Sequence, residues 1–241
     1  MSIALLIAKR ELGAFFKSWL GPVLVAGALL VDGLFFYFAN GLEEKALSGE
    51  VLTKFFYNTS GVTQIAAILV SFRLLAEERQ TGTLVLLNTS PVKDRDIVLG
   101  KFLAAVAVLT LTTLLSVYMP AWLFVHGKVA VGHIVVGYVG LLLLGSAIIA
   151  IGLFGSALAS SQVVALIIGT IIAAVFVLLW MVARATEPPL NQFLSALAVH
   201  HENFRPFMQG ILEPSGVIFY VLFTYAFLFA SVKVLEARRW Q

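Results

Sequence analysis

Six long apolar segments divide this chain and constrain its fold more than any other feature. A helix that crosses the hydrocarbon core of a bilayer needs about 20 mostly apolar residues. The chain is 60% hydrophobic and only 12% charged, so folding in water would expose large apolar patches. The segments are long and do not alternate in polarity, which favours helices over a closed barrel. We therefore expect an all-α integral membrane protein that spans the membrane at residues 19–39, 62–76, 100–125, 134–156, 163–183 and 216–235.

The positions of the basic residues predict how these spans are oriented. Cytoplasmic loops carry an excess of Lys and Arg, and six spans put both termini on one side. Most of the 16 Lys and Arg residues fall on that side: Lys9, Arg10, Lys17, Arg73, Arg79, Lys93, Arg95, Lys101, Lys233, Arg238 and Arg239. The other side holds Lys45, Lys54, Lys128, Arg184 and Arg205. We therefore expect cytoplasmic termini, and the small net charge of +3 gives no indication of a nucleic-acid partner.

Residues 1–18 form an amphipathic unit ahead of the first span. At 100° per residue, one arc of a helix collects apolar side chains: Leu5, Ala8, Leu12, Phe15, Phe16 and Trp19. The opposite side carries Arg10, Glu11, Lys17 and Ser18. This pattern predicts a helix that lies in the cytoplasmic interface of the membrane. The alternative is the start of a long, tilted first span.

The most polar cytoplasmic segment, residues 77–98, joins the second and third spans. Residues 81–83 predict a turn in which Thr83 can cap a following helix. Residues 84–87 are apolar and give one to two helical turns, which end before Pro91 because the residue before a proline avoids helical geometry. A short apolar helix of this kind can be an ordered loop, can rest on lipid, or can dock in a groove of a soluble partner.

This segment resembles the cytoplasmic segment of type-2 ABC export permeases and, more narrowly, is similar to the branch linked to gliding motility and copper-enzyme maturation. The resemblance is carried by Glu77, Glu78, Arg79, Gln80, Thr81, Gly82, Thr83, Leu84, Leu86, Leu87, Ser90 and Pro91. In that family the segment is the coupling helix, which docks on a separate cytoplasmic ABC ATPase subunit. The resemblance implies that these residues form the interface with such a subunit.

The resemblance covers nearly the whole chain and implies further properties. It implies a single transmembrane permease domain over residues 1–241, in the bacterial cytoplasmic (inner) membrane, with both termini cytoplasmic. A second permease subunit, identical or different, would complete the membrane part of the assembly. The partner ATPase would bind ATP and Mg²⁺, so no cofactor is expected in this chain. Weaker matches are residues 152–156 and 160–164, at the turn between the fourth and fifth spans, and Phe204, Phe207, Gly210 and Glu213, ahead of the last span.

The sequence lacks the residues of an ATPase or of a common metal site. It contains no G-x-x-x-x-G-K-[ST] loop and no cysteine, and the adjacent His200 and His201 would point about 100° apart on a helix. We therefore expect no catalytic residue and no bound metal. The leading hypothesis is a permease that couples ATP hydrolysis in a partner to export or mechanical work. The alternatives are a non-transporting membrane scaffold for motility or signalling, and a stand-alone channel or membrane enzyme.

Asp32 is the clearest ionisable residue inside a predicted span. Such a residue costs about 2.5–3.5 kcal/mol to insert, which makes it a candidate for function. Asp32 could lie on a substrate path or at a contact between two subunits. It could instead reach the outer headgroups or cap a kink at Gly33.

The outer segment at residues 188–214 is too polar to span, yet it carries apolar side chains at helical spacing. We expect helices that lie at the outer leaflet or dip into it, with Phe204, Phe207, Gly210 and Glu213 as candidates for the path or the dimer contact.

Two further features concern packing. Gly152, Ser156 and Ser160 form a row of small residues that predicts close helix packing within the subunit, and Pro120 predicts a kink in the third span.

Overall fold

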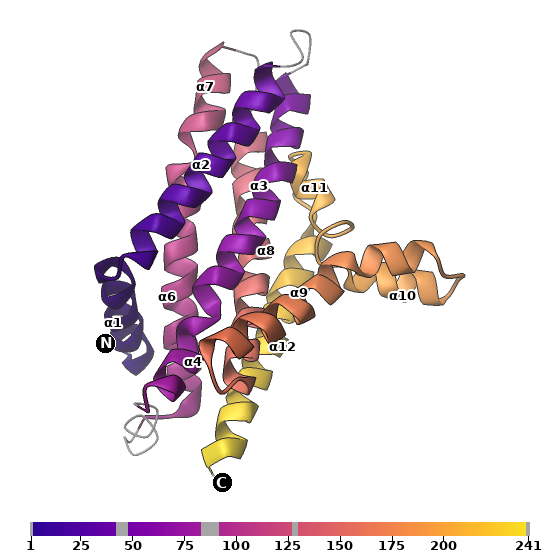
Figure 1. Cartoon of the computed structure of the whole chain (residues 1–241). Coiled ribbons are helices and arrows are strands. Elements are labelled where there is room, and N and C mark those ends of the chain that lie inside the picture. The colour runs from indigo at the N-terminus through magenta and orange to yellow at the C-terminus, as the bar shows by residue number, and fades with distance from the viewer. Residues whose placement is uncertain (1, 42–47, 83–91, 127–129, 240–241) are drawn as a thin grey trace.

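The computed structural model in Figure 1 describes residues 2–41, 48–82, 92–126 and 130–239. The described residues form helices and no strand, as the apolar segments predicted. The helices are α1 (Ile3–Lys17), α2 (Leu20–Gly41), α3 (Ser48–Ser71), α4 (Arg73–Gln80), α6 (Asp94–Leu115), α7 (Tyr118–His126), α8 (Val131–Leu158), α9 (Gln162–Arg184), α10 (Leu190–Leu197), α11 (Arg205–Met208) and α12 (Pro214–Arg239). Both termini lie at one end of the bundle, which we call the base (Figure 1).

The prediction of six membrane spans is confirmed, but two of the boundaries were wrong. Within the described residues, six helical stretches are long and apolar enough to cross a membrane: Leu20–Phe38, Gly49–Gln80, Asp94–Trp122, Val131–Leu158, Gln162–Arg184 and Pro214–Arg238. The second begins at Gly49 and not at residue 62, because the polar side chains of Thr59 and Ser60 are buried inside the bundle. The third begins at Asp94 and not at residue 100, because Asp94 and Lys101 are also buried.

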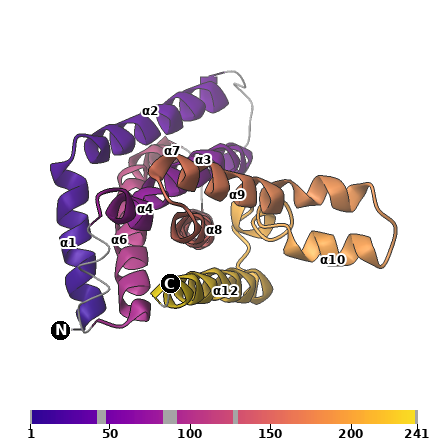
Figure 2. The same cartoon turned by 60° about the horizontal axis from the view of Figure 1, so that its bottom comes forward.

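Helix α8 is the centre of the bundle. Figure 2 shows α3, α6, α9 and α12 arranged around it, with α2 and α12 on opposite sides. Glycines allow the neighbouring helices to approach α8 closely. A Cβ on Gly137 would lie 2.3 Å from the Phe56 ring of α3, and one on Gly145 would lie 2.3 Å from Leu109 of α6. Close approach of this kind favours helix association in lipid, where apolar burial gives little drive.

Two of the spans are interrupted. The third breaks between α6 and α7, four residues before Pro120, whose ring clashes with a helical carbonyl at that position. The predicted kink is therefore confirmed. Ser116 lies at the break, where its hydroxyl donates to the Thr113 carbonyl at 2.8 Å and lies 2.9 Å from the Tyr138 hydroxyl. The second span breaks at Phe72, between α3 and α4.

Helix α1 is separate from the first span, so the alternative of one long tilted helix is wrong. Ser18 is extended at the break, and Figure 2 shows α1 and α2 running in different directions from the corner where they join. The predicted polar side is wrong in one respect. Glu11 faces the bundle, where it contacts Lys101. Ala4, Ala8 and Phe15 are buried, whereas apolar side chains including Leu5 and Phe16 remain exposed and suit contact with lipid.

Candidate functional site

The predicted ATPase interface begins on α4, at the base of the bundle. Four of its residues, Glu77, Glu78, Arg79 and Gln80, form the second half of that helix. Thr81 ends the helix, and Gly82 follows with φ +74°, in the left-handed region that glycine tolerates. The predicted turn is therefore confirmed at Thr81 and Gly82. The rest of the motif lies outside the described residues: Thr83, Leu84, Leu86, Leu87, Ser90 and Pro91.

A network of ion pairs joins α4 to α1 and α6. Lys101 of α6 is 1% exposed, and its Nζ lies 3.0 Å from Glu78 Oε1 and 3.2 Å from Glu11 Oε1. Arg10 bridges the same two carboxylates from outside, at 3.0 Å and 2.9 Å. We call Arg10, Glu11, Glu78 and Lys101 the base network. Each carboxylate in it has two cations, which is the condition under which a buried charge is tolerated.

Electrostatics within the base network keep Glu11 ionised. Burial by itself raises the pKa of a carboxyl group. The positive charge of Lys101 and the hydrogen bonds from Arg10 and Lys101 outweigh this effect, so the pKa of Glu11 lies below its usual range. Glu11 therefore stays negatively charged at neutral pH, and the ion pairs of the base network hold the entry helix α1 against α4.

Ser156 of α8 holds the start of α4 in place. Its hydroxyl donates to the Phe72 carbonyl at 2.7 Å and accepts from the N–H groups of Leu75 at 3.0 Å and Ala76 at 2.9 Å. These backbone groups lie where the helix is interrupted, so one side chain satisfies groups that the break leaves without partners. One turn earlier, a Cβ on Gly152 would lie 1.9 Å from Ser71 Oγ. The predicted packing of the small residues within the subunit is confirmed at these two positions.

The end of α4 contacts the turn between α8 and α9. The guanidinium group of Arg79 donates to the Ala159 carbonyl, and Gln80 Oε1 accepts from the Gln162 N–H at 3.3 Å. Ser161 caps α9 by accepting from the Val164 N–H at 3.4 Å. Two sequence motifs about 80 residues apart, which resemble the same family, therefore meet at one place in the fold.

The polar segment before the last span packs into the far half of the bundle. Phe204 and Phe207 are both fully buried, and Phe207 lies so close to α8 that a Cβ on Gly140 would be 2.5 Å from it. Gly140 is nine residues into α8, or about 14 Å at 1.5 Å per residue. Gly210 has φ +76° and turns the chain beside His133. Glu213, directly before α12, is exposed.

Within this chain, Phe204 and Phe207 act as anchors for that segment. A role for them, for Gly210 or for Glu213 in a path or dimer contact stays a prediction. His200 is also held here: its Nε2 lies 2.7 Å from Ser60 Oγ. Burial, reinforced by the charge of His201, lowers the pKa of His200 to about 4.

Asp32 lies inside the bundle and is 4% exposed. Its Oδ1 and the Thr59 Oγ1 are buried, and neither has a hydrogen-bond partner in the part of the chain that the structure describes. A role for Asp32 in a path or between subunits stays a prediction.

The sequence pattern missed the importance of Lys101 and Glu11. The sequence identifies Lys101 only as one of the cytoplasmic cations, and the periodicity of α1 predicts that Glu11 lies on its polar side. In each case an ionisable residue lies directly inside an apolar run, and this position could have predicted a buried, paired charge. Among the described residues, no group of three or more His, Asp or Glu side chains is placed to hold a metal ion.

Comparison with known proteins supports the resemblance that the motifs suggested. The family model described as "ABC-2 family transporter protein" matches residues 6–234, which is nearly the whole chain. A search of curated proteins finds no match. The matched region includes α4, all four residues of the base network, the first five candidate spans and most of the sixth. This chain therefore belongs to the ABC-2 transporter family and is a membrane component of that family.

Proposed function

We propose that this chain is the permease subunit of an ATP-driven transporter, on which a separate ATPase subunit acts through residues 83–91. The partner would bind ATP and Mg²⁺, and a second permease subunit would complete the membrane part. Membership of the ABC-2 family supports this proposal. The excess of basic residues at the base supports an orientation with both termini in the cytoplasm, in a bacterial cytoplasmic membrane.

The observation that carries the proposal is the way α4 is attached to the rest of the bundle. The base network ties its end to α1 and α6, Ser156 ties its start to α8, and Arg79 ties it to the turn before α9. A displacement of residues 83–91 would therefore reach three other helices, α1, α6 and α8, and the turn before α9, through side chains that are already in contact. Rigid attachment of this kind lets one element move its neighbours as a body.

The same attachment would serve export of a substrate or mechanical work on another protein. Both uses need a partner that hydrolyses ATP and a segment that conveys its motion. A scaffold that moves without transport shares these parts, whereas a stand-alone channel or enzyme needs neither. Uptake or release of candidate substrates by proteoliposomes that contain both subunits would separate an exporter from a scaffold.

The experiment that tests the proposal is purification of the full chain from native membranes in mild detergent, with identification of the proteins that accompany it and assay of ATP hydrolysis. We expect an ATPase subunit to co-purify with the wild-type chain. The variant Leu84→Asp with Leu87→Asp should lose both the partner and the activity, because charge on an apolar docking helix opposes burial in a groove.

The matched control adds two carboxylates at exposed positions of the far half, Gln192→Asp with Gln209→Asp. This control should keep the partner and the ATPase activity. If the Leu84 and Leu87 variant behaves as the wild type, or if nothing that binds nucleotide co-purifies, the coupling assignment is wrong. The channel and enzyme alternatives would then take its place.

A further inference from the structure

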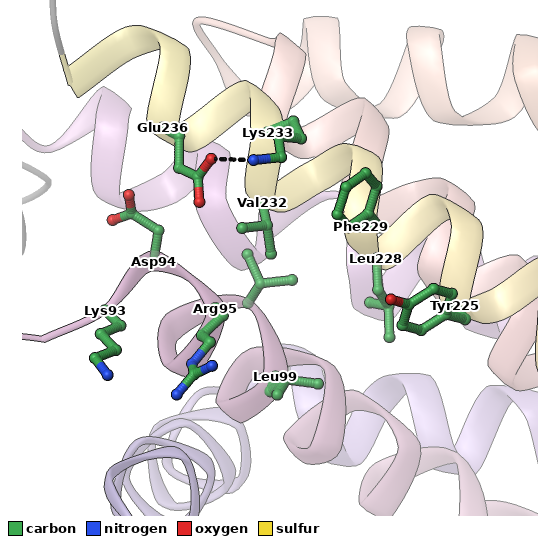
Figure 3. A pocket seen from close by; sticks show the side chains of 11 residues that line it. Lys93, Asp94, Arg95, Leu99, Tyr225, Leu228, Phe229, Val232, Lys233 and Glu236 are labelled. Carbon is green, nitrogen blue, oxygen red and sulfur yellow. Dashed lines mark hydrogen bonds and ion pairs between the residues drawn. The ribbon is translucent and has the colours of Figure 1, made fainter.

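A groove of about 680 Å³ opens at the base, between the start of α6 and the end of α12. Figure 3 shows it from close by. It lies away from the contacts that α4 makes with α8 and α9. The side chains that line it come from both helices and are Lys93, Asp94, Arg95, Val98, Leu99, Tyr225, Leu228, Phe229, Val232, Lys233 and Glu236.

The end of the groove nearest the base is cationic. Lys93 and Arg95 are exposed, and neither side chain makes an ion pair or hydrogen bond with another described residue. Figure 3 shows both pointing to the same side, away from the carboxylates of Asp94 and Glu236. The third cation, Lys233, is already paired with Glu236 at 2.7 Å. Two exposed basic side chains, without partners among the described residues, therefore lie at this end of the groove.

The other end of the groove is apolar and lies within the two spans. Leu99 is 41% exposed, Phe229 is 51% exposed and Tyr225 is 65% exposed. Leu99 follows Lys93 by six residues, or about 9 Å along a helix. The cationic end of the groove therefore suits the headgroup level of a membrane, and the apolar end suits its hydrocarbon region. The distance between the two ends matches the glycerol and the first part of an acyl chain of one lipid.

We propose that this groove binds one anionic phospholipid, with its phosphate between Lys93 and Arg95 and an acyl chain along Leu99, Tyr225 and Phe229. Basic pockets between membrane helices are suited to anionic headgroups. A soluble anion would use only the cationic end, and an uncharged lipid would use only the apolar wall. An anionic lipid matches both ends at once. The inference does not depend on the proposed function, because it uses neither residues 83–91 nor a partner subunit.

Native mass spectrometry of the full chain in detergent tests the proposal, with dioleoyl phosphatidylglycerol and dioleoyl phosphatidylcholine added in turn. We expect the wild type to retain one phosphatidylglycerol at concentrations where phosphatidylcholine is lost. Lys93→Gln with Arg95→Gln should weaken phosphatidylglycerol binding about thirtyfold, since each basic side chain near an anionic headgroup contributes about fivefold. The charge-conserving exchange Lys93→Arg with Arg95→Lys should restore most of the binding.

The matched control removes two cations of the same end of the bundle that lie outside the groove, Lys9→Gln with Lys17→Gln. It should bind phosphatidylglycerol as the wild type does. An equal loss in this control would mean that net charge alone attracts the lipid and would overturn the proposal. If inorganic phosphate at equal concentration displaces the lipid, the groove binds anions in general and has no specific place for an acyl chain. That result would also overturn the proposal. Cross-linking of Phe229→Cys to a second copy in liposomes would make this face a subunit contact, which also overturns the proposal.

Discussion

Lys101 is the residue whose replacement tests the base network most directly, and we predict that Lys101→Met destabilises the protein strongly. The ammonium group is 1% exposed and contacts the carboxylates of Glu11 and Glu78 at 3.2 Å and 3.0 Å. Methionine fills a similar volume but removes the charge. Two acidic groups, 19% and 13% exposed, would then face each other without the buried ammonium group between them, while Arg10 stays in contact with both.

The magnitude follows from the burial of the three groups. Removing one partner of a buried ion pair costs about 3–5 kcal/mol because the other charge stays buried. Here the carboxylates retain some solvent and Arg10 remains in contact, so we expect a loss of about 2–3 kcal/mol. In a protein of this size, that loss lowers the melting temperature by about 5–10 °C.

Thermal unfolding of the purified chain in detergent at pH 7.5 is the measurement, with Lys233→Met as the control. Lys233 is also paired with a glutamate, but the two side chains are 57% and 44% exposed, so its replacement should cost less than about 1 kcal/mol. Combining Lys101→Met with Glu11→Gln and Glu78→Gln should recover much of the loss, since no unpaired charge would stay buried. If Lys101→Met costs no more than the control, the base network does not stabilise the fold and the reasoning fails.

The pH dependence of the difference in stability between the wild type and Lys101→Met gives a second check. The pKa of Glu11 lies below its unfolded value of 4.5. Its contribution to stability is therefore complete above pH 4.5 and is lost as the pH falls through the folded value. The difference between wild type and Lys101→Met should shrink below about pH 4.5. A difference that stays constant to pH 3 would show that the loss arises from packing and not from charge.

Three further predictions use the same melting assay. Ser156→Ala should cost about 1–3 kcal/mol, because three backbone groups lose their partner; Ser146→Ala on the same helix, which loses only a bond to Leu142, should be nearly neutral. Asp32→Asn should stabilise the protein by about 1–2 kcal/mol, because an uncharged amide costs less to bury than a carboxylate. A loss of stability would show that the carboxyl group makes a contact that outweighs the cost of its burial. Because His200 resists protonation in the folded state, the free energy of unfolding should fall by up to about 3 kcal/mol as the pH drops from 6.5 to 4. The variant His200→Gln should flatten this pH profile. An unchanged profile would rule out His200 as its source.

The helices of this fold could be predicted from the sequence, because apolar length and proline positions act locally. The six spans, the turn at Gly82 and the kink before Pro120 all follow from residues within one or two helical turns. The start of the second span could not be predicted in this way. Hydropathy averages over all faces of a helix, and Thr59 and Ser60 lower that average although they are buried against other helices.

The candidate site could be predicted only in part, because it depends on which helices meet. The motif at residues 77–82 was evident as a polar string, but nothing in it specifies that Glu78 pairs with Lys101 and Arg10. The periodicity of α1 predicts that Glu11 lies on the polar side. That prediction assumes that a charged side chain must face water. In the fold, a buried cation from α6 takes the place of water.

The two motifs that resemble the ABC-2 family gain a physical explanation from their contact. Gly152 and Ser156 allow α8 to approach the break at Phe72 and satisfy its backbone groups. That fixes the start of α4, while Arg79 fixes its end to the turn that begins α9. An element held at both ends transmits displacement without bending, whereas one held by a single end would rotate. On the proposed function, replacing either Ser156 or Arg79 alone should already lower the coupling between ATP hydrolysis and transport, so the double variant should lose less than the two single effects added together. Strict additivity of the two effects would mean that the contacts act independently and that α4 does not move as one body.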